Sequence, residues 1–403
     1  MQTALRVSLA PGQKRHAVSS VPGALLVPGG ASIVLGAAAA RDGLVAPVAP
    51  TDRTCFAPRG ACFADDGSLW VADTGHHRLL GWSRVPAEDN APADHLVGQP
   101  TFLREGRNAK RDPGAATLNV PTGVTACGAG LALADAWNHR VLIWHTRPLR
   151  MNQPADVVLG QQDFCAVEAN RGSEHPEATT LFWPYGVAWD GVRLWVADTG
   201  NRRVLAWDGL PHHCGQPADL VLGQDGFSGR DENAGGAPDG RSMRWPHGIA
   251  FLRGGLCIAD AGNNRVMIWR DTPRRDNQGC DAIIGQADAS RVDHNQGDYW
   301  PSAAALNMPY AVFATGGWLA VADTASSRLL AWHADDIPGY GAPARLLAGQ
   351  HDWEAKGDNR WQAPARDSVC WPFGLSGDAR HALIADAGNN RVLLWRWSPE
   401  VAA

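Results

Sequence analysis

The stretch ADTGNRRVLAW, residues 197–207, decides the fold, because similar stretches occur six times along the chain. The copies begin at Ala72, Ala134, Ala197, Ala259, Ala322 and Ala385. Each has aspartate at its second position and tryptophan at its eleventh, and successive copies lie 62 or 63 residues apart. Self-similarity at a fixed period is the sequence signature of a repeat architecture. We therefore interpret the chain as six copies of one structural unit.

Two further registers keep nearly the same period. A proline precedes each copy, and a glycine stands two residues after that proline in every unit except the fifth, which has Ala311. These prolines are Pro58, Pro121, Pro184, Pro246, Pro309 and Pro372. A Gly-Gln pair follows each of the first five copies. Its glycines are Gly98, Gly160, Gly223, Gly285 and Gly349.

Each unit contains four short apolar or alternating segments, exemplified by GVAW, LWVAD, RVLAW and DLVLGQ between residues 186 and 224. Such segments, separated by glycine, asparagine and proline, predict β-strands. Four strands per repeat, arranged radially, are typical of a β-propeller. We therefore predict an all-β, six-bladed β-propeller with four antiparallel strands per blade. Its blades are expected near residues 55–99, 118–161, 181–224, 243–286, 306–350 and 369–397.

The last unit ends before a fourth strand, which would leave an open sheet edge. SIVLG, residues 32–36, has the missing pattern, and Gly36 lies 62 residues before Gly98. We predict that this segment completes the last blade and closes the ring. Residues 1–30 are then an N-terminal extension, and residues 31–397 form a single propeller.

The stretch PYGVAWDGVRLWVADTGNRRVLAW, residues 184–207, resembles the NHL repeat, and the resemblance extends over roughly residues 31–397. It implies the same propeller fold. Each unit carries an extra loop before its proline, similar to a longer bacterial variety of the repeat with G-Q-x-D-F. An asparagine stands ten residues after each Gly-Gln glycine. These are Asn108, Asn170, Asn233, Asn295 and Asn359.

The charge balance argues against a nucleic-acid partner. The net charge is −5 and charged residues make up 19% of the chain, so no overall basic field is present. Six arginines each follow the repeated aspartate by five residues, and we interpret them as Asp–Arg pairs within the blades rather than as an anion-binding ring. They are Arg78, Arg140, Arg203, Arg265, Arg328 and Arg391.

The eight cysteines occupy non-equivalent positions and form no C-x-x-C pair, which favours a reducing compartment. A disulfide between Cys214 and Cys280 is an alternative left open. Residues 21–40 resemble a signal peptide, but Pro22 and Pro28 interrupt the apolar run. We expect a cytoplasmic monomer, with export as the alternative. No uninterrupted apolar run has the length of a membrane helix.

Functional residues are expected where the units differ, on the end of the ring that carries the long loops, the P-x-G turns and the ADxGN turns. We call this end the loop-rich face. The residues after the prolines are Arg59, Thr122, Tyr185, His247, Tyr310 and Phe373. The variable turn residues are His76, His77, Trp137, His139 and Arg202. Aromatic, imidazole and guanidinium groups around a concavity predict a binding surface.

Catalytic groups are not evident. Some six-bladed relatives, the amidating lyase of NHL type and the lactonases of similar shape, hold an axial metal, but here His247 stands alone among the post-proline residues. No G-x-S-x-G motif or phosphate-binding loop occurs. We therefore predict a non-catalytic scaffold that binds a protein, peptide or small ligand and contains no cofactor or metal. We expect it to act as an accessory or assembly protein. The alternatives are a metal-dependent lyase or hydrolase with an axial site and an RNA-binding NHL domain.

Overall fold

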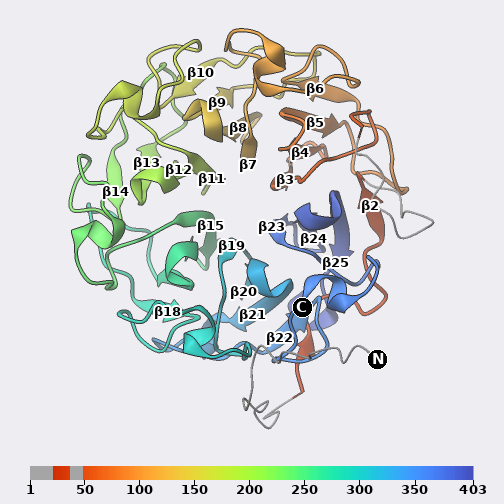
Figure 1. Cartoon of the computed structure of the whole chain (residues 1–403), viewed down its shortest axis with the longest axis vertical. Coiled ribbons are helices and arrows are strands. Elements are labelled where there is room, and N and C mark those ends of the chain that lie inside the picture. The colour runs from red at the N-terminus through yellow and green to blue at the C-terminus, as the bar shows by residue number, and fades with distance from the viewer. Residues whose placement is uncertain (1–20, 37–48, 403) are drawn as a thin grey trace, which may run out of the picture.

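The six repeats form six sheets that surround a central axis (Figure 1). The structure, a computed structural model, describes residues 21–36 and 49–402. Within each blade the strand that follows the conserved proline is innermost and the fourth strand is outermost. The prediction of an all-β, six-bladed propeller with four antiparallel strands per blade is confirmed.

The strands are given blade by blade, from the axis outward. The first blade contains β3 (Gly60–Phe63), β4 (Leu69–Asp73), β5 (Arg78–Trp82) and β6 (His95–Val97). The second contains β7 (Pro121–Cys127), β8 (Gly130–Asp135), β9 (Arg140–Trp144) and β10 (Val157–Leu159). The third contains β11 (Pro184–Trp189), β12 (Arg193–Asp198), β13 (Arg203–Asp208) and β14 (Leu220–Leu222). The fourth contains β15 (Pro246–Leu252), β16 (Gly255–Asp260), β17 (Arg265–Trp269) and β18 (Ala282–Ile284). The fifth contains β19 (Pro309–Thr315), β20 (Trp318–Asp323), β21 (Arg328–His333), β22 (Leu346–Ala348) and the added β1 (Gly23–Ala24). The sixth contains β23 (Pro372–Gly377), β24 (His381–Asp386), β25 (Arg391–Arg396) and β2 (Ile33–Leu35).

The helical elements are short and lie in turns and loops. Single 3₁₀ turns connect the second and third strands of blades two to six: η2 (Ala136–Asn138), η4 (Thr199–Asn201), η6 (Ala261–Asn263), η8 (Thr324–Ser326) and η11 (Ala387–Asn389). Others occur in the long loops: η1 (Arg107–Lys110), η3 (Ala169–Gly172), η5 (Glu232–Gly235), η7 (His294–Gly297) and η10 (Asp358–Trp361). The remaining ones are η9 (Ala334–Asp336) and α1 (Pro399–Ala402). None of the described helices is long and apolar enough to span a membrane.

Segments from the two ends of the chain share the last blade. Strand β2 pairs antiparallel with β25, with Ile33 opposite Leu394, and is the outermost strand of that sheet. Strand β1 pairs parallel with β22 of the fifth blade. The Leu25 backbone N–H donates to the Leu347 carbonyl oxygen at 3.1 Å. A similar contact covers β6, the outermost strand of the first blade. There the Asn152 backbone N–H, from the second blade, donates to the Leu96 carbonyl oxygen at 2.8 Å. Each such bond uses a backbone group that an exposed edge would leave unpaired.

The glycine of the P-x-G motif is required by packing at the axis. A Cβ atom on Gly186 would lie 2.0 Å from the His247 carbonyl oxygen, and one on Gly123 would lie 2.5 Å from the Tyr185 carbonyl oxygen. Both contacts join the innermost strands of neighbouring blades. At these two positions a residue with a side chain would therefore force the strands apart, whereas the fifth blade accommodates Ala311.

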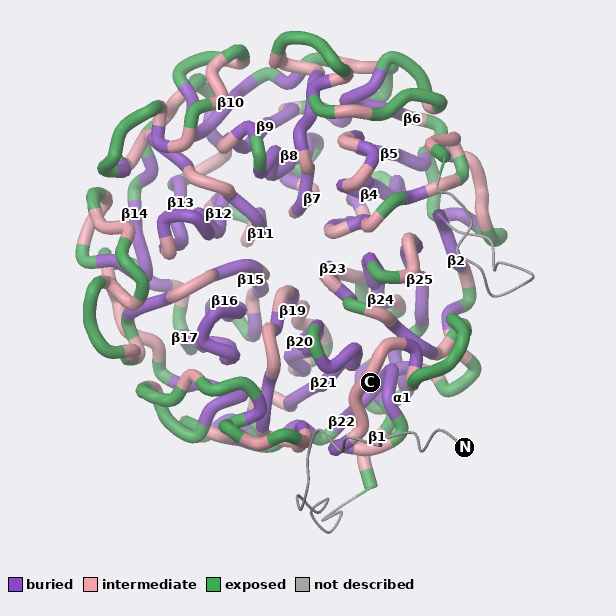
Figure 2. Tube along the Cα trace, in the orientation of Figure 1, coloured by how far each residue is buried: buried purple, intermediate pink, exposed green. Residues whose placement is uncertain are grey.

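The core lies between the blades, where the strands are buried and the loops around the rim are exposed (Figure 2). The repeated tryptophans are part of it. Trp207 is 1% exposed, and its indole Nε1 donates to the Gln216 carbonyl oxygen at 3.0 Å. Burial of such a large side chain with its polar atom paired stabilises each blade.

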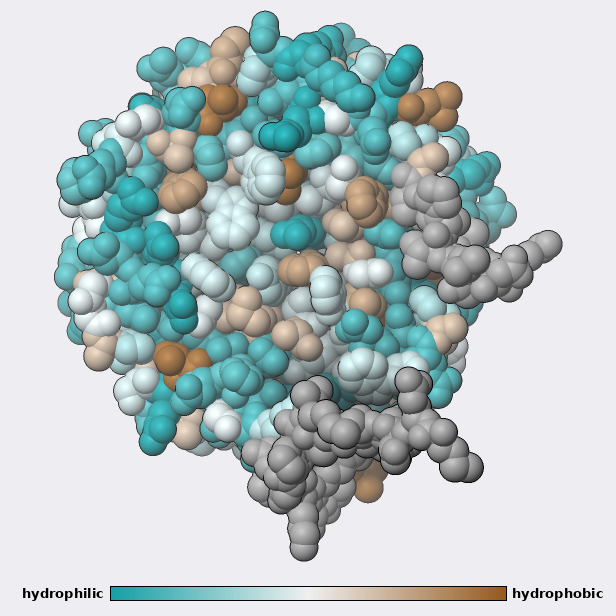
Figure 3. Space-filling model, in the orientation of Figure 1, coloured by the Kyte–Doolittle hydropathy of each residue, from teal (hydrophilic) through white to brown (hydrophobic). Residues whose placement is uncertain are grey.

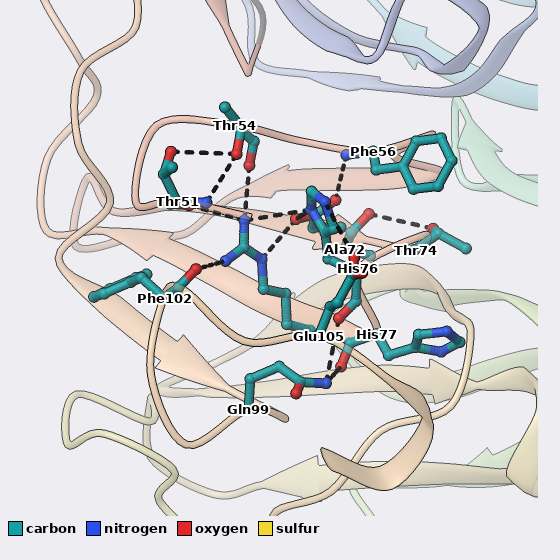
Figure 4. Close-up of polar contacts among 12 residues, drawn as sticks. Thr51, Thr54, Phe56, Ala72, Thr74, His76, His77, Gln99, Phe102 and Glu105 are labelled. Atoms are coloured by element: carbon teal, nitrogen blue, oxygen red, sulfur yellow. Dashed lines mark hydrogen bonds and ion pairs between the residues drawn. The ribbon is translucent and has the colours of Figure 1, made fainter. Parts of the chain in front are cut away.

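The repeated Asp–Arg pairs tie the turns and loops together. Figure 4 shows the polar contacts around the pair of the first blade, with Thr51, Thr54 and Phe102 labelled. Arg78 and Asp73 are fully buried, with Arg78 Nε 2.7 Å from Asp73 Oδ2. The other guanidinium nitrogens of Arg78 donate to the carbonyl oxygens of Phe102, Thr51 and Thr54. All six blades contain the equivalent pair. The arginines therefore hold the loops and do not form an anion-binding ring.

The Gly-Gln and asparagine positions of the long loops also have structural roles. Gln161 Nε2 donates to the carbonyl oxygens of His139 and Glu168, which joins the turn to the loop. The Asn170 and Asn201 side-chain amides donate to each other at 3.0 and 2.8 Å. Asn170 has a φ of 50°, a left-handed conformation that asparagine adopts more readily than most residues.

All eight cysteines are free thiols. The alternative of a disulfide between Cys214 and Cys280 is therefore not realised in this structure.

Candidate functional site

Five of the six post-proline side chains meet at the axis. The ring centroid of His247 lies 4.4 Å from that of Tyr185 and 4.2 Å from that of Tyr310. The Tyr310 and Phe373 centroids are 4.7 Å apart, and the Arg59 guanidinium carbon lies 4.5 Å from the Phe373 centroid. We call Arg59, Tyr185, His247, Tyr310 and Phe373 the axial cluster.

The repeat itself positions the axial cluster. Four of its members are the second residues of innermost strands, and Arg59 directly precedes β3. Proline fixes the backbone before each of them, and the following glycine or alanine lets the strands approach closely. The sixth post-proline residue, Thr122, is buried, and its hydroxyl donates to the Tyr185 carbonyl oxygen at 2.9 Å. Thr122 thus supports the cluster without adding a ring.

His247 is buried and neutral. Its Nδ1 lies 2.8 Å from the Trp245 carbonyl oxygen, so Nδ1 carries the proton and Nε2 is the acceptor. Nε2 is buried and has no hydrogen-bond partner within the described residues. Burial lowers the pKa of His247 to about 3. At neutral pH the cluster therefore contains an unused imidazole acceptor.

Arg59 supplies the positive charge of the cluster. Its guanidinium carbon lies over the rings of Phe373 and Tyr185, and its Nε is buried without a hydrogen bond in the part of the chain that the structure describes. Cation–π contacts stabilise the charge there only in part. Burial raises the pKa of Tyr185, and the neighbouring charge of Arg59 acts in the opposite direction. The cluster thus combines aromatic faces, a cation and a neutral acceptor.

The axial cluster borders a cavity of about 550 Å³ that runs along the innermost strands of all six blades. Apolar side chains such as Val187, Val312 and Leu375 line most of it. Among its polar lining groups, Ser376 already donates to the Ala61 carbonyl oxygen at 2.6 Å. The cavity is of the size that small-ligand pockets have, and it is mostly apolar, as such pockets are.

The three histidines of the turns have structural contacts. His77 Nδ1 accepts the backbone N–H of Val120, and His139 Nδ1 accepts that of Trp183, each at 3.0 Å. Burial lowers the pKa of both histidines. His76 is fully buried, with Nδ1 2.8 Å from an Asp73 carboxylate oxygen. These histidines join neighbouring blades or complete the first turn, and none belongs to the axial cluster.

Trp137 differs from the other turn candidates because its side chain is 52% exposed. It lines a surface groove together with His139 and Trp183. Trp183 was not predicted as a site residue, although its ring centroid lies 6.3 Å from that of His247. The sequence does mark this position as part of the repeat, because an apolar residue precedes the conserved proline in all six units.

Within the described residues, no group of three or more histidine, cysteine, aspartate or glutamate side chains is arranged to hold a metal ion. Within the axial cluster, His247 Nε2 is the atom best suited to bind a metal ion at neutral pH, because it is an unprotonated imidazole nitrogen without a hydrogen bond in the described residues. The arrangement can therefore stack an aromatic or apolar group, attract an anion and accept one hydrogen bond.

The NHL repeat family model matches residues 57–82. No curated protein matches the chain. A structure titled streptogramin B lyase is similar at 10% identity with a TM-score of 0.44, covering 87% of this chain and 95% of its own. Virginiamycin B lyase from Staphylococcus aureus is similar at 9% identity with a TM-score of 0.41, covering 84% of this chain and 94% of its own. Kuenenia stuttgartiensis hydrazine synthase is similar at 11% identity with a TM-score of 0.48, covering 89% of this chain and 99% of its own.

Proposed function

We propose that this propeller is a non-catalytic binding protein that holds a protein, peptide or small ligand on its loop-rich face, with the axial cluster as its anchor. The observation that carries the proposal is the convergence of five residues that differ between blades. Among them, Arg59 and His247 present polar atoms without hydrogen bonds in the described structure. The repeated Arg78, in contrast, uses all three of its guanidinium nitrogens in holding the fold. We propose an accessory or assembly role as one that such a binding protein can fill.

The test is recovery of the bound component. Tagged wild-type protein and the variants Arg59→Gln and Tyr310→Leu would be purified from the native host, and bound proteins and small molecules identified by mass spectrometry. We expect the wild type to retain a component that both variants lose, while their thermal unfolding remains cooperative. An identical set of bound components in all three proteins would rule out the axial cluster as the anchor.

A metal-dependent lyase or hydrolase remains the second candidate, and one observation favours it. His247 presents Nε2 while its Nδ1–H is held by a backbone carbonyl, which is the way that metal-ligating histidines are commonly oriented. Elemental analysis of the wild type and His247→Asn decides between the two functions. Stoichiometric metal that is lost in the variant would support the lyase or hydrolase. The net charge of −5 gives no comparable support to RNA binding.

A further inference from the structure

A second concave site lies on the loop-rich face, between the second and third blades. It is a groove of about 320 Å³ lined by Arg107, Asn119, Trp137, His139, Phe182 and Trp183. We call it the Trp137 groove. On the face drawn in Figure 3, hydrophilic residues dominate the periphery, whereas weakly polar and apolar residues gather toward the centre of the ring.

Trp137 stands where the repeat otherwise places a small residue. The equivalent positions are Gly75, Ala325, Gly200, Gly262 and Gly388. The Trp137 backbone N–H donates to the Asn119 carbonyl oxygen at 3.1 Å, and the N–H of Gly200 makes the equivalent bond in the next blade at 2.8 Å. The turn therefore forms with or without the indole. Trp137 is half-exposed, is not needed by the turn, and shares a concave site with Phe182 and Trp183, and this combination indicates an interaction site.

A polar group of the groove is also unused. Asn119 is 8% exposed, its Oδ1 is buried, and this oxygen has no hydrogen-bond partner among the described residues. A buried acceptor left unpaired is unfavourable unless a ligand supplies a donor. His139 accepts a backbone N–H at Nδ1, so its Nε2 carries the proton and can donate. Arg107 is exposed at the rim of the groove and adds further donors.

We propose that the Trp137 groove binds one sugar ring of a glycan. The C–H face of a pyranose packs against the flat apolar face of an indole, and both Trp137 and Trp183 present indoles here. The hydroxyl groups at the ring edge both donate and accept hydrogen bonds. They pair with Asn119 Oδ1 as acceptor and with His139 and Arg107 as donors. The volume of the groove suits one ring and its substituents.

Other ligand classes fit less well. A proline-rich peptide has few backbone N–H donors, because proline has none, and would therefore leave Asn119 Oδ1 unpaired. A cationic ligand would be repelled by Arg107, which lines the groove. The inference rests on the proposed function in one respect, that the loop-rich face is the binding face.

The experiment titrates the purified protein with defined sugars and follows ligand signals by saturation-transfer NMR, with affinities from calorimetry. The probes are di- and tetrasaccharides of glucose, galactose, N-acetylglucosamine and glucuronic acid. The test variant is Trp137→Gly, because glycine is the residue that most other turns carry. The matched control is Trp361→Gly, since Trp361 is 79% exposed, has a φ of 63° that glycine accepts, and lies outside the groove.

We expect the wild type to bind at least one probe, Trp137→Gly to lose about tenfold or more in affinity, and Trp361→Gly to bind as the wild type does. Binding of no probe by the wild type, or equal binding by Trp137→Gly, would overturn the assignment. Trp137-dependent binding of a proline-rich peptide in the absence of sugar binding would also overturn it. If Arg59→Gln loses a component that the wild type retains from the native host, while the wild type binds no sugar, this inference alone is wrong and the proposed function stands.

Discussion

His247 and Trp245 are joined by a hydrogen bond in which the imidazole Nδ1 lies 2.8 Å from the carbonyl oxygen. A carbonyl oxygen only accepts, so this bond fixes the neutral tautomer with a bare Nε2. Because Nε2 is buried, protonating it would place a charge in an apolar environment beside the cation of Arg59. The bond thus links the chemistry of the axial cluster to its pH dependence.

We expect the free energy of unfolding to decrease as the pH falls from about 6.5, the ordinary pKa of histidine, toward the lowered pKa of His247, about 3. Between these two pH values the histidine binds a proton in the unfolded chain but not in the folded chain. The contribution of neutral His247 to stability is therefore complete above about pH 6.5 and is lost progressively as the pH falls toward about 3. One group contributes up to about 1.4 kcal/mol per pH unit. Urea unfolding at several pH values measures it, and His247→Phe should flatten the dependence. The exposed His175, changed to asparagine, is the control, and equal slopes in all three proteins would contradict the prediction.

Gly186→Ala should destabilise the ring. The new Cβ would lie 2.0 Å from the His247 carbonyl oxygen, which belongs to the neighbouring blade and cannot rotate away. Such overpacking typically costs about 1–3 kcal/mol. Gly226→Ala is the matched control, because a Cβ there would meet nothing within 4 Å and its φ is not in the left-handed region. Equal thermal unfolding of the two variants would show that the innermost strands can separate without cost.

Asp198→Ala should be severely destabilising. It leaves the fully buried Arg203 without the carboxylate that lies 2.7 Å from its Nε. Removing one partner of a buried pair typically costs about 3–5 kcal/mol. The Arg193–Asp208 pair of the same blade provides the comparison, because Asp208 is 61% exposed. Asp208→Ala should cost at most about 1 kcal/mol in chemical unfolding experiments. If Asp198→Ala also cost only about 1 kcal/mol, the repeated pairs would not be structural.

The sequence predicts the blades well because the repeated residues have local backbone requirements. The buried pair formed by Asp198 recurs in all six blades, and the glycine at position 186 recurs in every blade except the fifth, which has Ala311, because the blades make similar contacts there. The axial cluster was predicted as a set of candidates, but not the burial of Tyr185 and His247. Burial there depends on which side chains arrive from the other blades, and no single repeat contains that information.

The turn residues show the same limit. His77 and His139 were candidates because they vary between blades, yet each accepts a backbone N–H from the following blade. Asn264 makes the equivalent contact with Met308 through its side-chain oxygen. Histidine and asparagine thus serve one structural purpose with different atoms. Sequence variation at these positions therefore does not by itself indicate a functional role.

Residues that reach the axis can be divided experimentally into anchors and packing groups. Tyr185 and His247 are buried, so alanine at either position should lower stability through the cavity it creates, by about 2–5 kcal/mol. Arg59 and Tyr310 are only partly buried. Arg59→Gln and Tyr310→Leu should therefore retain most of the stability. Thermal unfolding of the four variants measures this division, and equal losses in all four would show that the cluster serves packing alone.

The last prediction concerns the closure of the sixth blade. Strand β2 pairs with β25, and Trp395 Nε1 donates to the Val27 carbonyl oxygen at 2.7 Å, so residues 21–36 complete both the sheet and its core. Deleting residues 1–36 should expose the edge of β25 and its apolar face, and we expect aggregation or a markedly lower unfolding temperature. A synthetic peptide of residues 21–36 should restore the unfolding temperature by re-pairing with β25, whereas the same peptide with Val34→Asp should not, because Val34 is buried. Unchanged melting after the deletion would show that three strands suffice to close the ring.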